Sequence, residues 1–203
     1  MSKTKSNAFK NIIVLFVVAL VSVSILAVLN QITLEPIAKA EADATAAVYK
    51  AVYADAADFE EIEKYGENSS YKPEDDSIVI NGVLNAKSSS GEILGYVFDV
   101  TSKNGYGGDV QIAVGITKKG EITAFKVISA SETPGLGAKA MEEEYASQFS
   151  GLKADEVKFV KGSSANRDNN EIDAISGATI TTTATTNAVN EAIKLFNAEL
   201  KGE

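Results

Sequence analysis

The sequence predicts an α+β protein with a single N-terminal transmembrane helix, followed by one domain in which a mainly antiparallel sheet is packed by helices. Three observations favour this class. An apolar run covers Ile12 to Leu29, apolar side chains alternate from Val110 to Ile116, and apolar or small residues recur at helical spacing from Ile180 onward. Alternation with a period of two indicates a strand with one buried face, whereas recurrence every three or four residues indicates an amphipathic helix.

Composition narrows the chemistry that this chain could carry. Its 203 residues contain no cysteine and no histidine, and their formal net charge is −9. Without cysteine there can be no disulfide, no cysteine-ligated iron–sulfur cluster and no c-type haem attachment. Without histidine the commonest haem and zinc ligand is also missing, so redox chemistry would require an organic cofactor. The acidic charge argues against a nucleic-acid partner.

The apolar run from Ile12 to Leu29 is interrupted only by Ser22 and Ser24. As a helix it would be roughly 27 Å long, close to the ~30 Å hydrocarbon core of a bilayer. We therefore expect residues 11–30 to form a transmembrane helix. A cleaved signal peptide is the alternative, because Ala38-Lys39-Ala40 has the form of a cleavage site. The apolar run is longer than the ~7–15 residues usual in a signal peptide, which favours an uncleaved anchor.

The flanks of this run predict the orientation of the chain. Three lysines precede it, and every acidic residue follows it. By the positive-inside rule, residues 1–10 would stay in the cytoplasm and the remainder would lie outside the cell membrane. We expect residues 31–66 to form an alanine-rich helical stalk running to about Tyr65, and residues 67–203 to form the extracytoplasmic domain. The apolar stripe of the stalk is too short and too alanine-rich to argue strongly for a coiled-coil dimer.

The middle of the chain predicts an antiparallel sheet of about four strands with one buried face. The strands are expected at residues 78–86, 93–101, 110–117 and 122–129, with a further short strand at 157–160. The glycine-rich segment from Gly105 to Gly108 lies between two of these strands and lacks the lysine and the helix of a phosphate-binding loop. We interpret it as an ordinary loop. Within it, Tyr106 could stack on a ring system or be buried with a hydrogen bond.

Two segments are expected near the end of the sheet. Residues 138–149 have a helical pattern, and the polar segment from Gly162 to Glu171 is expected to be an exposed and mobile loop. This loop holds Arg167, the sole arginine of the sequence. Its guanidinium could pair with a phosphate or with Asp173, or could simply be solvated.

Two short motifs are candidates for a binding site. Glu-Thr-Pro-Gly-Leu-Gly, from Glu132 to Gly137, has glycines that would let the backbone approach a flat or bulky group. Asp-Ala-Ile-Ser-Gly-Ala-Thr, from Asp173 to Thr179, precedes the C-terminal helix. The first turn of a helix has backbone N–H groups without intrahelical partners and a partial positive charge, which favour an anion such as a phosphate. The simpler alternatives are a strand-to-helix turn and an N-cap at Ser176 or Thr179.

Together these motifs resemble the FMN-binding domain family, in which a flavin transferase attaches FMN through its phosphate to the threonine of Asp-x-x-Ser-Gly-Ala-Thr. With the N-terminal helix, the chain resembles the G subunit of the Rnf ion-translocating electron-transport complex. It is also similar to the C subunit of the sodium-translocating NADH:quinone reductase. The resemblance covers nearly the whole chain. One difference is Ala130, where members of the Rnf group often carry a histidine, so a proton-transfer role at that position is impossible here.

The resemblance implies a set of site residues. Thr179 would carry FMN as a phosphoester, and Asp173 would take part in recognition by the transferase or act only as a turn carboxylate. A separate transferase is implied, because a threonine hydroxyl is a poor nucleophile and the chain has no histidine to act as its base. The other residues expected to bind the cofactor are Ser176, Gly177, Ala178, Thr133, Gly135, Leu136 and Gly137.

The function implied by the resemblance is electron transport. The chain would be a redox subunit, not catalytic alone, of a complex that oxidises reduced ferredoxin, reduces NAD and translocates Na⁺ or H⁺. Its partners would be the other membrane subunits. Ferredoxin and NAD would bind those subunits, because this chain has neither a dinucleotide-binding fingerprint nor cluster ligands. The alternatives are the quinone-reductase subunit and a non-redox, membrane-tethered surface or binding module.

Overall fold

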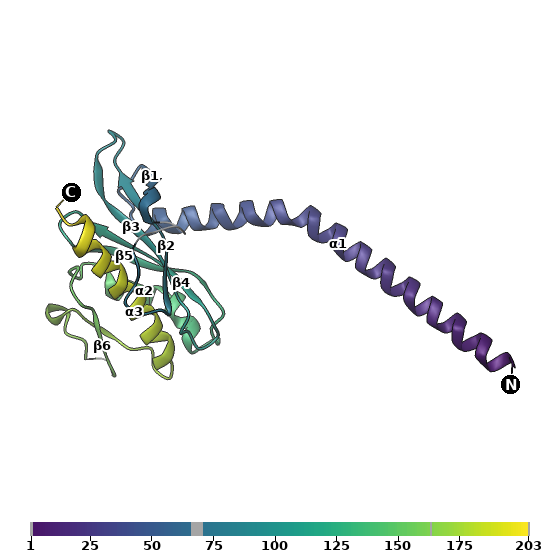
Figure 1. Ribbon diagram of the computed structural model, residues 1–203. Helices are drawn as coiled ribbons and strands as arrows, with labels where there is room; N and C mark the ends of the chain where they lie inside the picture. Colours follow the sequence, from purple (N-terminus) through teal and green to yellow (C-terminus); the bar gives the residue numbers. More distant parts are fainter. Residues whose placement is uncertain (1, 66–70, 163, 203) are drawn as a thin grey trace. The chain divides into compact units, whose positions relative to one another are not determined.

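The computed structural model describes residues 2–65, 71–162 and 164–202, with side chains from Phe9 onward (Figure 1). The chain divides into two units, Met1–Thr45 and Ala46–Glu203, each of which is considered by itself. The described part of the first unit lies entirely within helix α1 (Ser2–Val52), whose last residues belong to the second unit.

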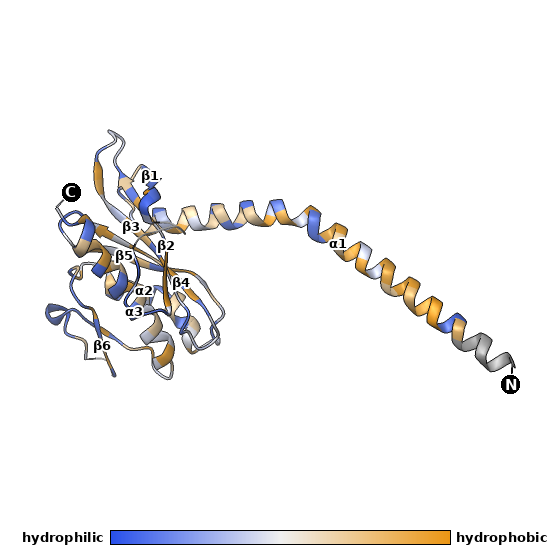
Figure 2. Cartoon of the chain, viewed as in Figure 1, coloured by the Kyte–Doolittle hydropathy of each residue, from blue (hydrophilic) through white to orange (hydrophobic). Residues whose placement is uncertain are grey.

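The first unit has the properties of a membrane span. Within the described residues, one helix is long and apolar enough to cross a membrane, and this stretch begins at Phe9. Figure 2 shows the apolar residues of α1 in orange. The hydroxyls of Ser22 and Ser24 donate to the carbonyl oxygens of Val18 and Leu20, at 2.9 and 2.8 Å. Both polar side chains are therefore satisfied inside the helix, as a lipid environment requires.

Helix α1 is continuous through its proline and ends at Val52, so the expectation of a helix to about Tyr65 was too long. The residues that follow form the strand β1 (Asp58–Glu61) and the 3₁₀ turn η1 (Glu63–Tyr65). In β1 only Phe59 is half-buried, and the acidic side chains around it are exposed. An acidic edge strand of this kind has no alternating apolar pattern that would distinguish it from the helix before it.

The domain is built on a five-stranded antiparallel sheet. Its order β1-β2-β3-β4-β5 follows the chain, so every strand pairs with its neighbours in sequence. The strands after β1 are β2 (Ile78–Lys87), β3 (Ile93–Ser102), β4 (Val110–Thr117) and β5 (Ile122–Ala130). The four strands expected in this region are confirmed, and β1 adds a fifth at the edge.

Short elements connect the sheet to the C-terminal helix. They are η2 (Gly137–Met141), α2 (Glu143–Ala146), η3 (Ser147–Phe149), β6 (Lys158–Val160), η4 (Arg167–Asn169) and β7 (Glu171–Asp173). The helical pattern expected at 138–149 is thus broken into three pieces, and β6 pairs in parallel with β7. The chain continues with α3 (Thr179–Leu195) and the π-helical turn η5 (Phe196–Leu200).

Both faces of the sheet are covered within the domain. On one face α3 packs against β2, β3 and β4 and buries the larger core, which includes Phe98 and Ile112. On the other face the last turn of α1 buries a smaller cluster around Val52, Val97 and Ala113. The expectation of a single buried face was therefore wrong. The second face went unnoticed because its residues on β4 are small, and small residues give a weak hydrophobic signal.

A polar network joins the last turn of α1 to the sheet. The buried carboxylate of Asp99 accepts hydrogen bonds from the Tyr49 hydroxyl at 2.7 Å, from Asn81 Nδ2 at 2.6 Å and from Gln111 Nε2 at 2.8 Å. Burial, followed by the Asp99 charge, raises the pKa of Tyr49 far above its ordinary value. The phenol therefore stays protonated and can donate to Asp99 at any physiological pH.

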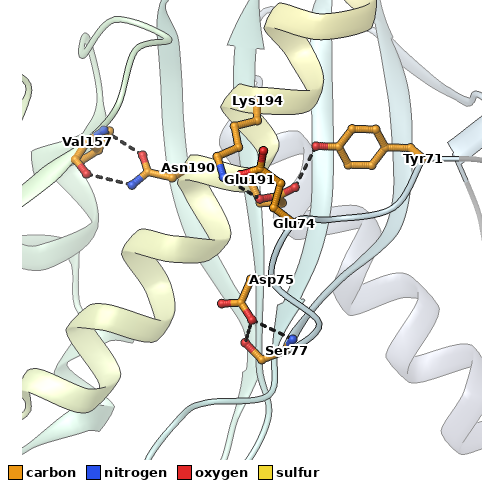
Figure 3. Close-up of polar contacts among 8 residues, drawn as sticks. All are labelled: Tyr71, Glu74, Asp75, Ser77, Val157, Asn190, Glu191 and Lys194. Carbon is orange, nitrogen blue, oxygen red and sulfur yellow. Dashed lines mark hydrogen bonds and ion pairs between the residues drawn. The ribbon is translucent and has the colours of Figure 1, made fainter.

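Side chains of α3 tie this helix to the loops on either side of it (Figure 3). The Asn190 amide donates to the Val157 carbonyl oxygen at 2.9 Å and accepts from the Val157 N–H at 2.8 Å. The Tyr71 hydroxyl donates to the buried Glu191 at 2.8 Å. These contacts fix the rotation of α3 about its axis and hence the residues that its first turn presents.

We expect Gly115→Ala to destabilise the domain by about 1–3 kcal/mol, the usual cost of inserting an atom into a packed interior. A Cβ at Gly115 would lie 2.2 Å from Thr123 Oγ1 and 2.6 Å from the carbonyl oxygen of Val52. Gly82→Ala is the matched control, because its Cβ would have no closer contact than 3.6 Å, to Glu61. Thermal unfolding of the full chain in detergent should show a lower midpoint for Gly115→Ala alone. Equal midpoints for the two variants would contradict the packing described.

Candidate functional site

A cleft of about 460 Å³ lies where three loops of the domain meet. They are the β3–β4 loop, the β5–η2 loop and the turn that enters α3. The residues lining the cleft are Tyr106, Glu132, Thr133, Leu136, Gly137, Gly177, Ala178, Thr179, Ile180 and Thr181. Both sequence motifs contribute to this lining, so segments that are far apart in the chain form one site.

Thr179 is the first residue of α3, and it is exposed. The N-cap residue is Ala178, whose methyl side chain cannot accept a hydrogen bond. The alternative in which Ser176 or Thr179 caps the helix is therefore wrong. Because its N-cap cannot accept, the first turn of α3 has backbone N–H groups that an external anion could use, and the helix dipole favours a negative charge there.

Gly177 shapes the approach to this helix. Its φ is +78°, in the left-handed region that other residues rarely adopt. A Cβ at this position would also lie 3.2 Å from Leu136 Cδ2. The glycine therefore lets the two motifs come close together, and a larger residue would require a small shift of the Leu136 side chain as well as a strained backbone.

Exposure separates Thr179 from the other threonines of α3. Four of these side chains are buried: Thr181, Thr182, Thr185 and Thr186. The remaining one, Thr183, is half-buried, and its hydroxyl donates to the Thr179 carbonyl oxygen at 2.8 Å. Of the threonines in this helix, Thr179 is thus the one at which a bulky group could be attached without opening the domain.

The buried carboxylate of Glu132 connects the three loops around the cleft. Its Oε1 accepts hydrogen bonds from the backbone N–H groups of Tyr106 at 2.8 Å and Gly107 at 3.2 Å, and its Oε2 accepts from the Thr181 hydroxyl at 2.9 Å. This role of Glu132 cannot be predicted from the sequence around it, because its partners belong to the β3–β4 loop and to α3. The available signal was the position of Glu132 as the first residue of its motif.

Three large apolar side chains line the cleft and remain accessible. Tyr106, Leu136 and Ile180 are 69, 43 and 52% exposed. Exposed apolar side chains gathered in one place mark a ligand-binding or partner-binding surface. Of the two uses considered for Tyr106, burial is excluded and the ring is free to stack. The cleft thus offers apolar walls for a flat ring beside a helix N-terminus suited to an anion.

The other expected site residues lie outside the lining of this cleft. Ser176 and Asp173 line a neighbouring cleft of about 440 Å³, together with Tyr145. Gly135 forms the turn of the first motif, with a φ of +77°. Burial raises the pKa of Tyr145 to about 12, so its hydroxyl is protonated at neutral pH.

Asp173 holds the loop that follows β6. Its carboxylate accepts from the backbone N–H groups of Ser164 and Ala165, at 2.9 and 3.0 Å. The structure therefore gives Asp173 the role of a turn carboxylate, which leaves a second role in recognition open. Its position beside the second cleft keeps part of the side chain accessible.

The polar segment containing Arg167 is mostly exposed in its described residues, as expected, and it is held by several side-chain hydrogen bonds. Arg167 donates to the carbonyl oxygens of Gln148 and Ser150, so its guanidinium is held by backbone and does not pair with Asp173. Asn170 is buried and donates to the carbonyl oxygen of Lys153 at 2.9 Å. Asn170 is thus a buried exception in a segment whose described residues are mostly exposed, because side-chain amides can satisfy backbone carbonyls inside a loop; the mobility of the loop stays a prediction.

Comparison with known proteins identifies the family. Residues 105–194 match the family model of the FMN-binding domain. The chain is also 36% identical, over 194 residues, to the G subunit of the Na⁺-translocating ferredoxin:NAD⁺ oxidoreductase complex of Acetobacterium woodii, a match that covers 93% of this chain and 91% of that protein. The chain belongs to the G-subunit family of ion-translocating oxidoreductase complexes. The G subunit of the ion-translocating oxidoreductase complex of Methanosarcina acetivorans is 30% identical over 191 residues, which cover 94% of this chain and 95% of that protein.

The resemblance of the chain to the G-subunit family of Rnf complexes is thereby confirmed. The match to the FMN-binding domain includes all three loops of the cleft. The fold of this G-subunit family member also resembles the crystal structure of Shewanella oneidensis NqrC, with a TM-score of 0.52 and 22% identity, over 63% of this chain and 65% of that chain. At that identity the likeness concerns the fold alone. It agrees with the expected α+β class.

For this G-subunit family member, we expect Asp173→Ala to lower the free energy of unfolding by about 1–2 kcal/mol, because two backbone N–H groups lose their acceptor. Hydrogen exchange at Ser164 and Ala165, measured by mass spectrometry, should become faster. Asp168→Ala is the control, since Asp168 is exposed in the neighbouring turn η4 and should leave both quantities unchanged. Unaltered exchange at Ser164 and Ala165 in Asp173→Ala would exclude the loop-holding role.

Proposed function

We propose that this chain is a membrane-anchored flavoprotein subunit that carries electrons through FMN attached by its phosphate to Thr179. The observation that carries the proposal is the exposed position of Thr179 as the first residue of α3, inside the segment that matches the FMN-binding domain. When bound, FMN would supply the redox chemistry, and the protein would fix its position and its reduction potential.

The start of α3 suits the phosphate of such an ester. A phosphodiester keeps one negative charge, which the N-terminal end of a helix stabilises by about 0.3–1 kcal/mol at an exposed position. The methyl side chain of Ala178 leaves the first-turn N–H groups free of competition from a capping oxygen. Gly177, with its positive φ, keeps side-chain bulk away from the same turn.

The adjoining cleft suits the ring of FMN. Its volume of about 460 Å³ lies within the range of roughly 300–1,000 Å³ that is usual for small-molecule and cofactor sites. Leu136 and Ile180 offer apolar surface, and Tyr106 offers an aromatic face on which a flat ring could stack. Covalent tethering at Thr179 would reduce the need for a deep non-covalent pocket, which agrees with the accessibility of these side chains.

Maturation would require a flavin transferase as a partner. The chain has no histidine, so it lacks the usual base that would activate the Thr179 hydroxyl. The accessible part of Asp173 would be one of the features that the transferase recognises.

The proposed partners are the other membrane subunits of an ion-translocating ferredoxin:NAD oxidoreductase complex. The names of two relatives describe those proteins as the G subunit of such a complex. Ferredoxin and NAD would bind other subunits. Residues 11–30 would cross the cell membrane, residues 1–10 would remain in the cytoplasm, and the FMN-binding domain, after a stalk, would lie outside. Electrons would then pass through this chain on the outer side of the membrane.

Thr179→Val should abolish covalent flavin attachment, because valine keeps the shape of the side chain and removes the oxygen that would be esterified. The full chain would be co-expressed with a flavin transferase, and flavin fluorescence would be recorded on a denaturing gel under ultraviolet light. Thr183→Val is the matched control on the same helix and should keep full fluorescence. Ser176→Ala should reduce attachment less than Thr179→Val does.

Two results would count against this proposal. Fluorescence that persists in Thr179→Val would place the flavin on another residue. A wild-type chain that stays dark after co-expression with an active transferase would exclude the covalent linkage.

The orientation can be tested with introduced cysteines, because the natural sequence has none that would give background labelling. We expect Lys103→Cys, at an exposed position of the FMN-binding domain, to react with a membrane-impermeant maleimide in intact cells. Ser2→Cys should react only after the cells are permeabilised, since the N-terminus would be cytoplasmic. The opposite labelling pattern would reverse the proposed orientation.

A further inference from the structure

Glu132 places a carboxylate on the wall of the cleft without a cation to balance it. The residue is 8% exposed, and none of the ion pairs among the described residues involves it. Its three hydrogen-bond donors, the N–H groups of Tyr106 and Gly107 and the hydroxyl of Thr181, are all neutral. Burying a charge that only neutral donors compensate is unfavourable compared with burying a neutral side chain. If Glu132 had a structural role alone, a neutral side chain could fill it at a lower free-energy cost of burial.

The backbone is packed tightly around this carboxylate. A Cβ added at Gly137 would lie 2.2 Å from Oε2, and a Cβ added at Gly105 would lie 2.8 Å from Oε1. Both positions are glycines, so main chain approaches the charge from two sides. With water excluded from these sides, the field of the charge is screened less than the field of a charge at the surface.

The charge lies close to the proposed attachment point. Oε2 of Glu132 accepts from Thr181, which belongs to the same first helical turn as Thr179. Glu132 and Thr179 also line the same cleft, together with Leu136. A cofactor tethered at Thr179 and seated in the cleft would therefore lie within the field of Glu132. Adding an electron to a ring near a fixed negative charge is electrostatically unfavourable, and this lowers the reduction potential of the ring.

We propose that Glu132 is a positioning residue for FMN with two effects: it joins the three loops that surround the ring, and its charge keeps the reduction potential of the flavin low. This inference rests on the proposed attachment of FMN to Thr179. The two effects are separable, because glutamine can preserve the contacts of Glu132 while removing its charge. Its amide oxygen can still accept from the two N–H groups, and its NH₂ group can donate to the Thr181 oxygen.

The test is spectroelectrochemical titration of the full-length flavinylated chain and its variants in detergent. Glu132→Gln should load flavin to the wild-type extent on a denaturing gel and should shift the midpoint potential in the positive direction. Glu142→Gln removes the same charge from an exposed position outside this cleft and should leave the potential unchanged. Equal potentials for the wild type and Glu132→Gln would overturn the electrostatic effect.

Thr181→Val provides an independent test of the joining effect. It keeps the charge of Glu132 and removes its link to α3, so the fluorescence anisotropy of the bound flavin should fall. An unchanged anisotropy would overturn the joining effect even if Glu132→Gln failed to fold or to load. A wild-type chain without flavin on Thr179 would instead refute the proposed function.

Discussion

The site of this chain depends on one buried carboxylate. Glu132 follows strand β5 closely, and its two oxygens accept hydrogen bonds from the β3–β4 loop and from the first turn of α3. The β3–β4 loop is anchored by the two strands that it connects, and the first turn of α3 is anchored by the packing of that helix on the sheet. The carboxylate therefore sets the relative position of the loops at the point where the cleft forms. Glycines at positions 105 and 137 allow the main chain to close around it.

The sheet and α3 form the rigid framework to which the segments joined by Glu132 are attached. Its larger core, between the strands and α3, is closed by aromatic and branched side chains, and its other face is closed by the last turn of α1. The hydrogen bonds of Asn190 and of Tyr71 hold α3 against rotation, so Thr179 is presented at a fixed place at the start of that helix. A site borne by the end of a packed helix is positioned more precisely than a site on a free loop.

The main features of the cleft all fall within the segment that matches a known domain family. The exposed threonine, the helix N-terminus beside it and the apolar walls of the cleft lie in the part of the chain that matches the FMN-binding domain. The likeness to NqrC shows that a similar fold also occurs in a protein of low sequence identity. Much of the fold is therefore compatible with many side chains.

The sequence by itself determined the apolar N-terminal helix, four strands of the sheet, the C-terminal helix and the motif ending at Thr179, because each depends on residues that are neighbours along the chain. The tertiary structure decided that Thr179 is exposed while Thr181 and Thr182 are buried, which a run of similar threonines does not disclose. It also decided the partners of Glu132 and the burial of the second face of the sheet. Burial and long-range hydrogen bonds arise only when segments that are distant in the sequence come into contact. The local periodicity of the sequence does not indicate which segments these are.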